Sequence, residues 1–304
     1  LYDFIKKSWN CHELWYNERM KYPKINLKTV RLQARQFQAA NPRLFLVFAL
    51  PSMLLIFSGF LNPLARLHED ILDQPFISML GQMIQVYFFP LLVTFISTIF
   101  LTSSAFTTLR LIKDPETELS LKNSLALFDE QRFSQTFLTL LLKRFYLFLW
   151  SIPSLLGIYF LFYSSLLARR FVALHPEFPA IDLYSTEAEH FLFTFALYFF
   201  ASLLFIILGN SLYIPQYYAY SQVELILCDA LEVGQAKPRQ ILKTSRFLMK
   251  GYKFQRFVLD LQLLPWYFLN WITFGIASFS LLPYIQSSQI IFYRTLLALK
   301  RRKI

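Results

Sequence analysis

Long apolar segments constrain this chain more than any other feature of its sequence. Each is close to the roughly 20 residues that an α-helix needs to cross a ~30 Å hydrocarbon layer. Charged residues make up 16% of the chain and hydrophobic residues 56%, whereas soluble domains carry about 25% charged residues. The sequence therefore predicts an all-α, polytopic membrane helix bundle. Six spans are expected, at residues 44–62, 76–104, 136–162, 190–214, 257–274 and 276–297.

The distribution of basic residues predicts the orientation of these spans. In a six-span topology, three of the 30 Lys and Arg residues lie on the side opposite the N-terminus, namely Arg66, Arg169 and Arg170. Cytoplasmic loops are enriched in Lys and Arg, so both termini are expected in the cytoplasm. The net charge of +11 is then explained by topology, and no nucleic-acid partner is expected. The short turn in "FGIASFSLLPY" leaves open one re-entrant segment in place of the last two spans.

Part of the chain matches itself at an offset of 121 positions. This shift aligns Ser124 with Ser245 and Trp150 with Trp271. Matches of Ser and Trp at one offset indicate parallel internal repeats, each with a surface helix, an outward span and a returning span. The expected organisation is a basic N-terminal segment (1–43), a transmembrane domain (44–297) with repeat units at about 21–104, 116–214 and 236–297, and a basic tail (298–304).

A basic stretch, "KPRQILKTSRFLMKGY", precedes the fifth expected span. Pro238 suits the first turn of a helix and Gly251 its end. One face of this helix would be apolar and another cationic, which predicts a helix in the membrane interface with its apolar face in lipid. "KTVRLQAR" near the N-terminus repeats the cationic spacing. The residues expected to bind lipid or a partner are Lys28, Arg31, Arg35, Lys243, Arg246, Lys250 and Lys253.

The segment from Tyr213 to Leu297 resembles a bacterial integral membrane family known as domain of unknown function 975. The resemblance is carried by "YIPQYYAYS", "SRFLMKG", "FVLDLQLLPW", "ITFGIASFSLLPY" and "IIFYRTLL". It implies a multi-pass protein of the bacterial cytoplasmic membrane and implies no activity. The chain departs from the family pattern at Gln216, where a glycine is expected after Pro215.

Motifs for catalysis are absent from the sequence. It contains no HExxH, GxxxxGK[ST], GxGxxG or GxSxG pattern, so we expect no enzyme activity, cofactor or metal. Outer-loop residues of "HED" (68–70) and "EAEH" (187–190) could approach one another and bind zinc. We favour the interpretation that these loops are simply acidic and form no metal site. Cys11 and Cys228 are expected to be free thiols on the cytoplasmic side.

Several polar residues are expected near membrane depth, where ionisable groups usually face a bundle interior or a cavity. Pro215 is expected to kink the fourth span ahead of two of the acids. Asp260 has an alternative, because it lies one turn from Arg256 and can pair with it at the interface. The candidate intramembrane site comprises Glu224, Asp229, Asp260, Tyr217 and Tyr220.

Two functions are compatible with these features. The first is a non-enzymatic accessory or scaffold protein of the envelope, which docks anionic lipid or a membrane partner through its basic helices. The second is a small transporter or lipid-handling protein with a pathway lined by the intramembrane acids and tyrosines. Expected partners are the lipid bilayer with its anionic headgroups, and a membrane protein or a second copy of the chain.

Overall fold

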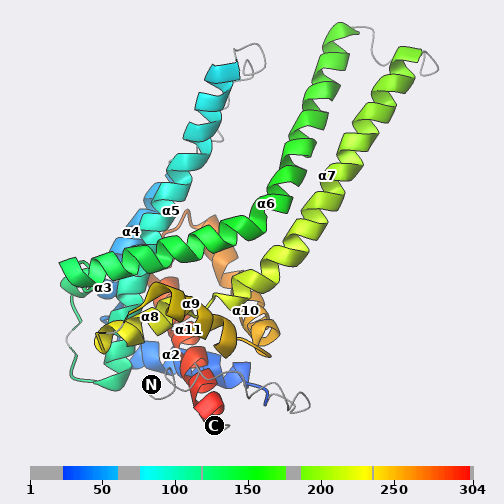
Figure 1. Cartoon of the computed structure of the whole chain (residues 1–304). Helices are drawn as coiled ribbons and strands as arrows, with labels where there is room; N and C mark the ends of the chain where they lie inside the picture. Colours follow the sequence, from blue (N-terminus) through cyan, green and yellow to red (C-terminus); the bar gives the residue numbers. More distant parts are fainter. Residues whose placement is uncertain (1–22, 61–75, 118, 176–185, 235, 302–304) are drawn as a thin grey trace. The chain divides into compact units, whose positions relative to one another are not determined.

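The computed structural model describes residues 23–60, 76–117, 119–175, 186–234 and 236–301, and every regular element in these residues is a helix (Figure 1). This confirms the all-α prediction for the described residues. The elements are α2 (Leu27–Ala40), α3 (Leu44–Val47), α4 (Ala49–Phe60), α5 (Phe76–Lys113), the 3-10 helix η5 (Leu121–Leu125), α6 (Glu130–Leu174), α7 (Thr186–Ala219), α8 (Val223–Glu232), α9 (Pro238–Leu248), α10 (Lys253–Ile272) and α11 (Ser278–Arg301).

Three helical stretches in the described part of the chain are long and apolar enough to cross a membrane. They are Leu91–Lys113 in α5, Glu130–Leu174, which is all of α6, and Thr186–Glu232, which covers α7 and α8. The other expected spans coincide with α4, α10 and α11. Those three helices are too short or too polar to meet the same criterion.

The chain divides into two compact units, one formed by residues 1–141 with 221–304 and one by residues 142–220. At the centre of the first unit is α5, which packs against α4, η5 and α8. Buried Ser and Thr residues cover the C-terminal half of α5. Small residues of this kind let neighbouring helices approach closely, and their hydroxyls bond to backbone carbonyls. Examples are the bonds of Thr102 and Thr108 to the carbonyls four residues earlier.

The end of α3 shows how these hydroxyls hold the first unit together. The last carbonyls of a helix have no partner within it. The Val47 carbonyl accepts hydrogen bonds from Ser104 Oγ of α5 at 2.7 Å and from Ser124 Oγ of η5 at 2.5 Å. All three residues are buried. Two segments distant in sequence therefore meet at one carbonyl.

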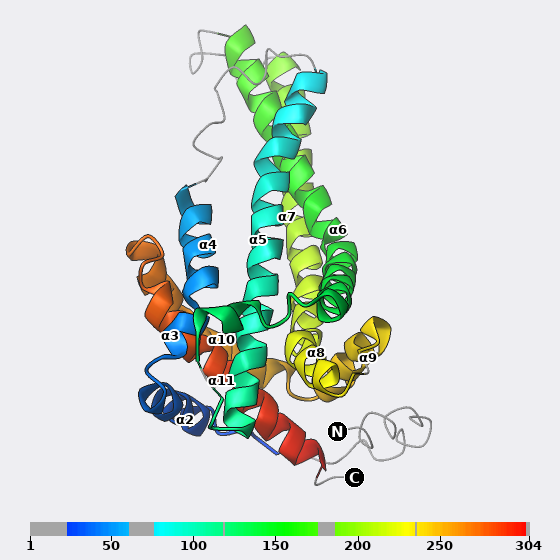
Figure 2. The same ribbon diagram turned by 90° about the vertical axis from the view of Figure 1, so that its left-hand side faces the viewer.

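The basic N-terminal helix α2 packs along α11 (Figure 2). Its N-cap is Asn26, whose side chain accepts from the amides of Lys28 and Thr29, as N-cap residues do. Near its other end, Gln38 Nε2 donates to the Ser280 carbonyl at 2.9 Å. This hydrogen bond joins the C-terminal part of α2 to the start of α11.

The second unit is built on close contact between α6 and α7. A Cβ atom added to Gly209 would lie 2.4 Å from the Ser154 amide nitrogen, and one added to Gly157 would lie 2.8 Å from the Ile206 amide nitrogen. These distances are too short for any side chain, so glycine is what allows the two backbones to approach. Aromatic side chains extend the contact, for example Tyr163 against Tyr198 at 4.6 Å between ring centroids.

Large apolar side chains face outward along these two helices. On α7, Phe193, Phe200 and Ile207 are 71%, 66% and 64% exposed and recur every seven residues. The most apolar windows of Glu130–Leu174 and Thr186–Glu232 are only 11% and 6% buried by protein. Exposed apolar area of this extent requires a non-aqueous environment, which agrees with membrane association.

Two backbone features refine the sequence predictions. Pro215 lies inside α7, and the helix is interrupted at Tyr220–Gln222 rather than at the proline. Between α10 and α11 the chain turns at Phe274 and Gly275, whose φ angles are 49° and 87°. A continuous α11 of 24 residues follows, which at 1.5 Å per residue is about 36 Å long. This length is sufficient for a complete span.

The internal repeat remains a prediction. Ser124 and Ser245, which the repeat aligns, are both fully buried. The elements that contain them differ, however, because η5 is a 3-10 helix of 5 residues and α9 is an α-helix of 11 residues.

Candidate functional site

The helix α8 places a carboxylate inside the first unit. Its sequence, "VELILCDALE", is apolar around most of its circumference, and residues 225–231 are all buried. Burial of this helix on several sides also buries Asp229, whose side chain is 7% exposed. A carboxylate in such a place is stable when charged and polar partners surround it.

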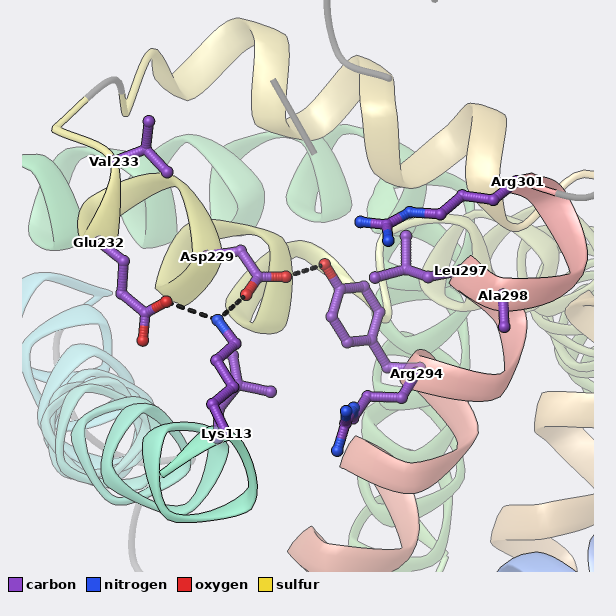
Figure 3. Close-up of a pocket in the computed structure, with 10 residues that line it drawn as sticks. Lys113, Asp229, Glu232, Val233, Arg294, Leu297, Ala298 and Arg301 are labelled. Atoms are coloured by element: carbon purple, nitrogen blue, oxygen red, sulfur yellow. Dashed lines mark hydrogen bonds and ion pairs between the residues drawn. The ribbon is translucent and has the colours of Figure 1, made fainter. Parts of the chain in front are cut away.

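Three helices supply these partners (Figure 3). Lys113, the last residue of α5, donates from Nζ to Asp229 Oδ1 at 2.8 Å and to Glu232 Oε2 at 2.5 Å. Tyr293 of α11 donates its hydroxyl to Asp229 Oδ2 at 2.6 Å. Both oxygens of Asp229 are therefore satisfied. We call Lys113, Asp229, Glu232 and Tyr293 the polar cluster, and it ties together the ends of α5, α8 and α11.

A cavity of about 380 Å³ adjoins the polar cluster. Two exposed arginines of α11, Arg294 and Arg301, reach it from the opposite side to Asp229 and Glu232 (Figure 3). The remaining wall is mostly apolar. The lining consists of Leu109, Lys113, Asp229, Glu232, Val233, Tyr293, Arg294, Leu297, Ala298 and Arg301.

A second candidate surface is the cationic side of α9. Lys243 and Arg246 of α9 are exposed, as the helical spacing predicts, and so is Lys250, two residues beyond the end of the helix. The opposite face carries Ile241, Leu242, Ser245 and Leu248, which are all buried, as are Met249 and Tyr252 just after the helix. That face is covered by protein, since α9 packs against α8 and α11. The expectation that it inserts into lipid is therefore wrong, because the fold itself buries this apolar area.

A neighbouring cation, Lys300, strengthens the attachment of α9. Lys300 of α11 lies over the rings of Phe247 and Tyr252, with Nζ 5.2 Å and 5.7 Å from the ring centroids. These are cation–π contacts. Lys253, at the start of α10, is half-buried, and this burial, with the charge of Arg246, lowers the pKa of its ammonium group below 10.5. Lys253 is thus less accessible than Lys243, Arg246 and Lys250.

The N-terminal set of basic residues is only partly displayed. Lys28 and Arg35 are exposed, whereas Arg31 is half-buried. The guanidinium of Arg35 lies 5.8 Å from the centroid of the Tyr284 ring on α11. The α2 helix therefore uses part of its charge for packing.

The family comparison covers all of these elements. A family model described as a protein of unknown function (DUF975) matches residues 20–300. The chain belongs to the DUF975 family. The match extends the resemblance seen at residues 213–297 to nearly the whole chain, including every residue of the polar cluster. No curated protein and no solved structure matches this DUF975 protein.

The residues of the candidate intramembrane site are divided between the two compact units of this DUF975 structure. Asp229 is in the polar cluster, while Asp260 lies 3.3 Å from the guanidinium of Arg256 on the same helix. That pairing was the alternative considered for Asp260. Glu224 is in the first turn of α8. Tyr217 and Tyr220 belong to the second unit, where Tyr220 stacks on Tyr146.

Sequence reasoning did not find the partners of Asp229 in this DUF975 protein. Lys113 appears in the sequence as one of 30 Lys and Arg residues, and Tyr293 as one of 17 tyrosines. Their hydrogen bonds to Asp229 join residues 116 and 64 positions apart. A contact between residues so far apart leaves no local pattern in the sequence. Glu232 is different, because it lies on the same face of α8 as Asp229, three residues later.

The remaining candidate residues show no metal site. Within the described residues, no group of three or more His, Cys, Asp or Glu side chains could hold a metal ion. His175 Nε2 lies 3.4 Å from Glu187 Oε2, while His68 and the acids after it lie outside the described residues. Cys228 is a free, buried thiol, as predicted, and Cys11 also lies outside the described residues.

Proposed function

We propose that this DUF975 protein crosses the bacterial cytoplasmic membrane six times, with both termini in the cytoplasm. Three long apolar helices support a membrane location, and α4, α10 and α11 coincide with the other expected spans. The excess of Lys and Arg on one side of this topology supports the orientation. In this arrangement α2, α8, α9 and the end of α11 face the cytoplasm.

The proposed role is that of a non-enzymatic accessory protein, which gathers anionic lipid at its cytoplasmic face. The observation that carries this proposal is the exposed row formed by Lys243 and Arg246 of α9 and by Lys250 just beyond it, while the opposite face of the helix is buried. Packing already fixes the helix, so binding orders little backbone and costs little entropy. Each cation near an anionic surface contributes about 1 kcal/mol. Three of them together would favour anionic lipid by roughly 3 kcal/mol, or about two orders of magnitude.

The test neutralises this row. The triple variant Lys243→Gln, Arg246→Gln, Lys250→Gln is purified in native-lipid nanodiscs, and mass spectrometry gives the ratio of anionic to zwitterionic lipids retained. The control is Arg169→Gln with Arg170→Gln, two exposed cations of α6 on the opposite side of the proposed topology. We expect the triple variant to lose the excess of anionic lipid that the parent and the control retain.

Two results would contradict this role. An unchanged ratio of anionic to zwitterionic lipid in the triple variant would show that these cations do not gather anionic lipid. Loss of a stoichiometric, co-purified protein from the triple variant, with the lipid ratio unchanged, would replace it with docking of an acidic partner. A second copy of the chain would be recognised as that partner by its mass.

Lipid handling is a second candidate function. The expected pathway lined by Glu224, Asp229 and Asp260 has little support, because Asp229 and Asp260 pair with different residues. The feature that favours lipid handling is instead the cavity beside the polar cluster, which contains both charged and apolar walls.

A further inference from the structure

The cavity between α5, α8 and α11 has the properties of a small ligand site. Its volume of about 380 Å³ falls within the range of known ligand pockets, about 300–1,000 Å³. All of its lining residues belong to the first compact unit. Its apolar wall is formed by side chains such as Leu109, Val233 and Leu297, and its polar residues converge from three helices.

The charges around this cavity are not balanced. Asp229 and Glu232 are both bonded to Lys113, and Asp229 also accepts from the Tyr293 hydroxyl. The two carboxylates are therefore already engaged within the polar cluster. Arg294 and Arg301 form no ion pair with any carboxylate that the structure describes. Three cations and two anions line the cavity, which leaves a formal charge of +1 for a ligand to neutralise.

The two arginines are placed to act together. They are seven residues apart on α11, which is two helical turns and about 10.5 Å of rise, so both project from the same face. Both side chains line the cavity (Figure 3). Guanidinium groups bind phosphate oxygens in a bidentate manner.

Lys113 offers a further donor toward the same cavity. Its ammonium group has three N–H donors, and two of them are used by Asp229 and Glu232. The third is not bonded to any residue in the described ranges. The cavity thus has donors on two sides and an apolar wall for carbon atoms next to the bound anion.

We propose that this cavity binds a phosphate diester, held between Arg294 and Arg301 with Lys113 on the opposite side. A diester carries a single negative charge, which matches the +1 of the lining residues. A phosphate monoester carries about −1.5 to −2 at pH 7 and would leave negative charge uncompensated next to Asp229 and Glu232. Two sources have this chemistry, the headgroup of an anionic phospholipid and a soluble glycerol phosphodiester. The site uses no residue of α9, so it does not depend on the lipid-gathering role proposed above.

Binding of defined probes to the full chain tests this site. The protein is held in nanodiscs of zwitterionic lipid, and titration calorimetry measures the Kd for dihexanoyl phosphatidylglycerol, for its deacylated headgroup glycerophosphoglycerol, and for inorganic phosphate. The variants are Arg294→Gln, Arg301→Gln and the pair together. The matched control is Arg169→Gln with Arg170→Gln, which removes the same charge from exposed positions of α6 outside the cavity.

We expect saturable binding of a diester probe by the parent and the control. Each arginine substitution should weaken it about 10-fold, and the pair about 100-fold, since hydrogen bonds to charged groups are stronger than those between neutral groups. Tighter binding of the phosphatidyl probe than of its headgroup identifies lipid as the source, and equal binding identifies a soluble diester. Both arginines are exposed, so the variants should keep the parent's thermal midpoint.

The proposal is overturned if the parent binds neither diester, or if the double arginine variant binds with the parent's Kd. Tighter binding of inorganic phosphate than of either diester would also overturn it. None of these results bears on the anionic lipid ratio of the α9 triple variant, so failures of the two proposals are distinguishable.

Discussion

The hydrogen bond from Tyr293 to Asp229 allows us to predict how much one oxygen atom contributes to the stability of the fold. Tyr293→Phe removes the phenolic oxygen and leaves the ring, which is 1% exposed, in place. The bond is 2.6 Å long, within the short range of charge-assisted O–H···O⁻ bonds. Such bonds contribute about 1.5–3 kcal/mol. The Asp229 side chain is 7% exposed, so water does not readily replace the lost donor, although Lys113 still neutralises the carboxylate. We expect a loss of about 2 kcal/mol in the free energy of unfolding.

Unfolding in mixed micelles of mild detergent and sodium dodecyl sulphate measures this quantity, with the five tryptophans as the fluorescent signal. The control is Tyr159→Phe, because that side chain is 60% exposed on α6 and its substitution should change stability by less than about 0.5 kcal/mol. A Tyr293→Phe variant as stable as the parent would refute the reasoning. A double-mutant cycle with Asp229→Asn should show coupling of about 1 kcal/mol or more.

Three further substitutions test packing inside the units. Gly209→Ala places a methyl group 2.4 Å from the Ser154 amide nitrogen, so it should destabilise the second unit by about 1–3 kcal/mol; a stability equal to the parent's would show that the helices are not in contact there. Ser104→Ala and Ser124→Ala should each cost about 1 kcal/mol or less. Together they should cost more than the sum, because only the double variant removes both donors from the Val47 carbonyl. Additive costs in the same unfolding assay would contradict a shared role.

Local patterns were sufficient to predict much of the architecture. The helical character of all six apolar segments, the exposure of Lys243 and the burial of Leu248 follow from composition and period, because these properties depend on residues a few positions apart. The position of the helix interruption was less predictable. Pro215 remains inside α7 and the break comes at Tyr220–Gln222, since a helix can include a proline where neighbouring groups satisfy the backbone.

The membrane interpretation of α9 shows where local reasoning was insufficient. An amphipathic helix has the same sequence pattern whether lipid or protein covers its apolar face. In this fold α8 and α11 lie against α9, so Ile241 and Leu248 are buried by protein. The cations remain exposed in either case, which is why the proposed binding residues on α9 are retained while the mode of contact changes.

The sequence by itself determined that this chain is helical and suited to a membrane, because apolar length and charge distribution act through the solvent rather than through particular contacts. The tertiary structure alone decided the site. Asp229 becomes the centre of a polar cluster because the fold brings Lys113 and Tyr293 from distant helices to its two oxygens. The same arrangement engages the acids and leaves Arg294 and Arg301 facing a cavity. Such a charge imbalance depends on which helices meet, and that is a property of packing rather than of any local pattern.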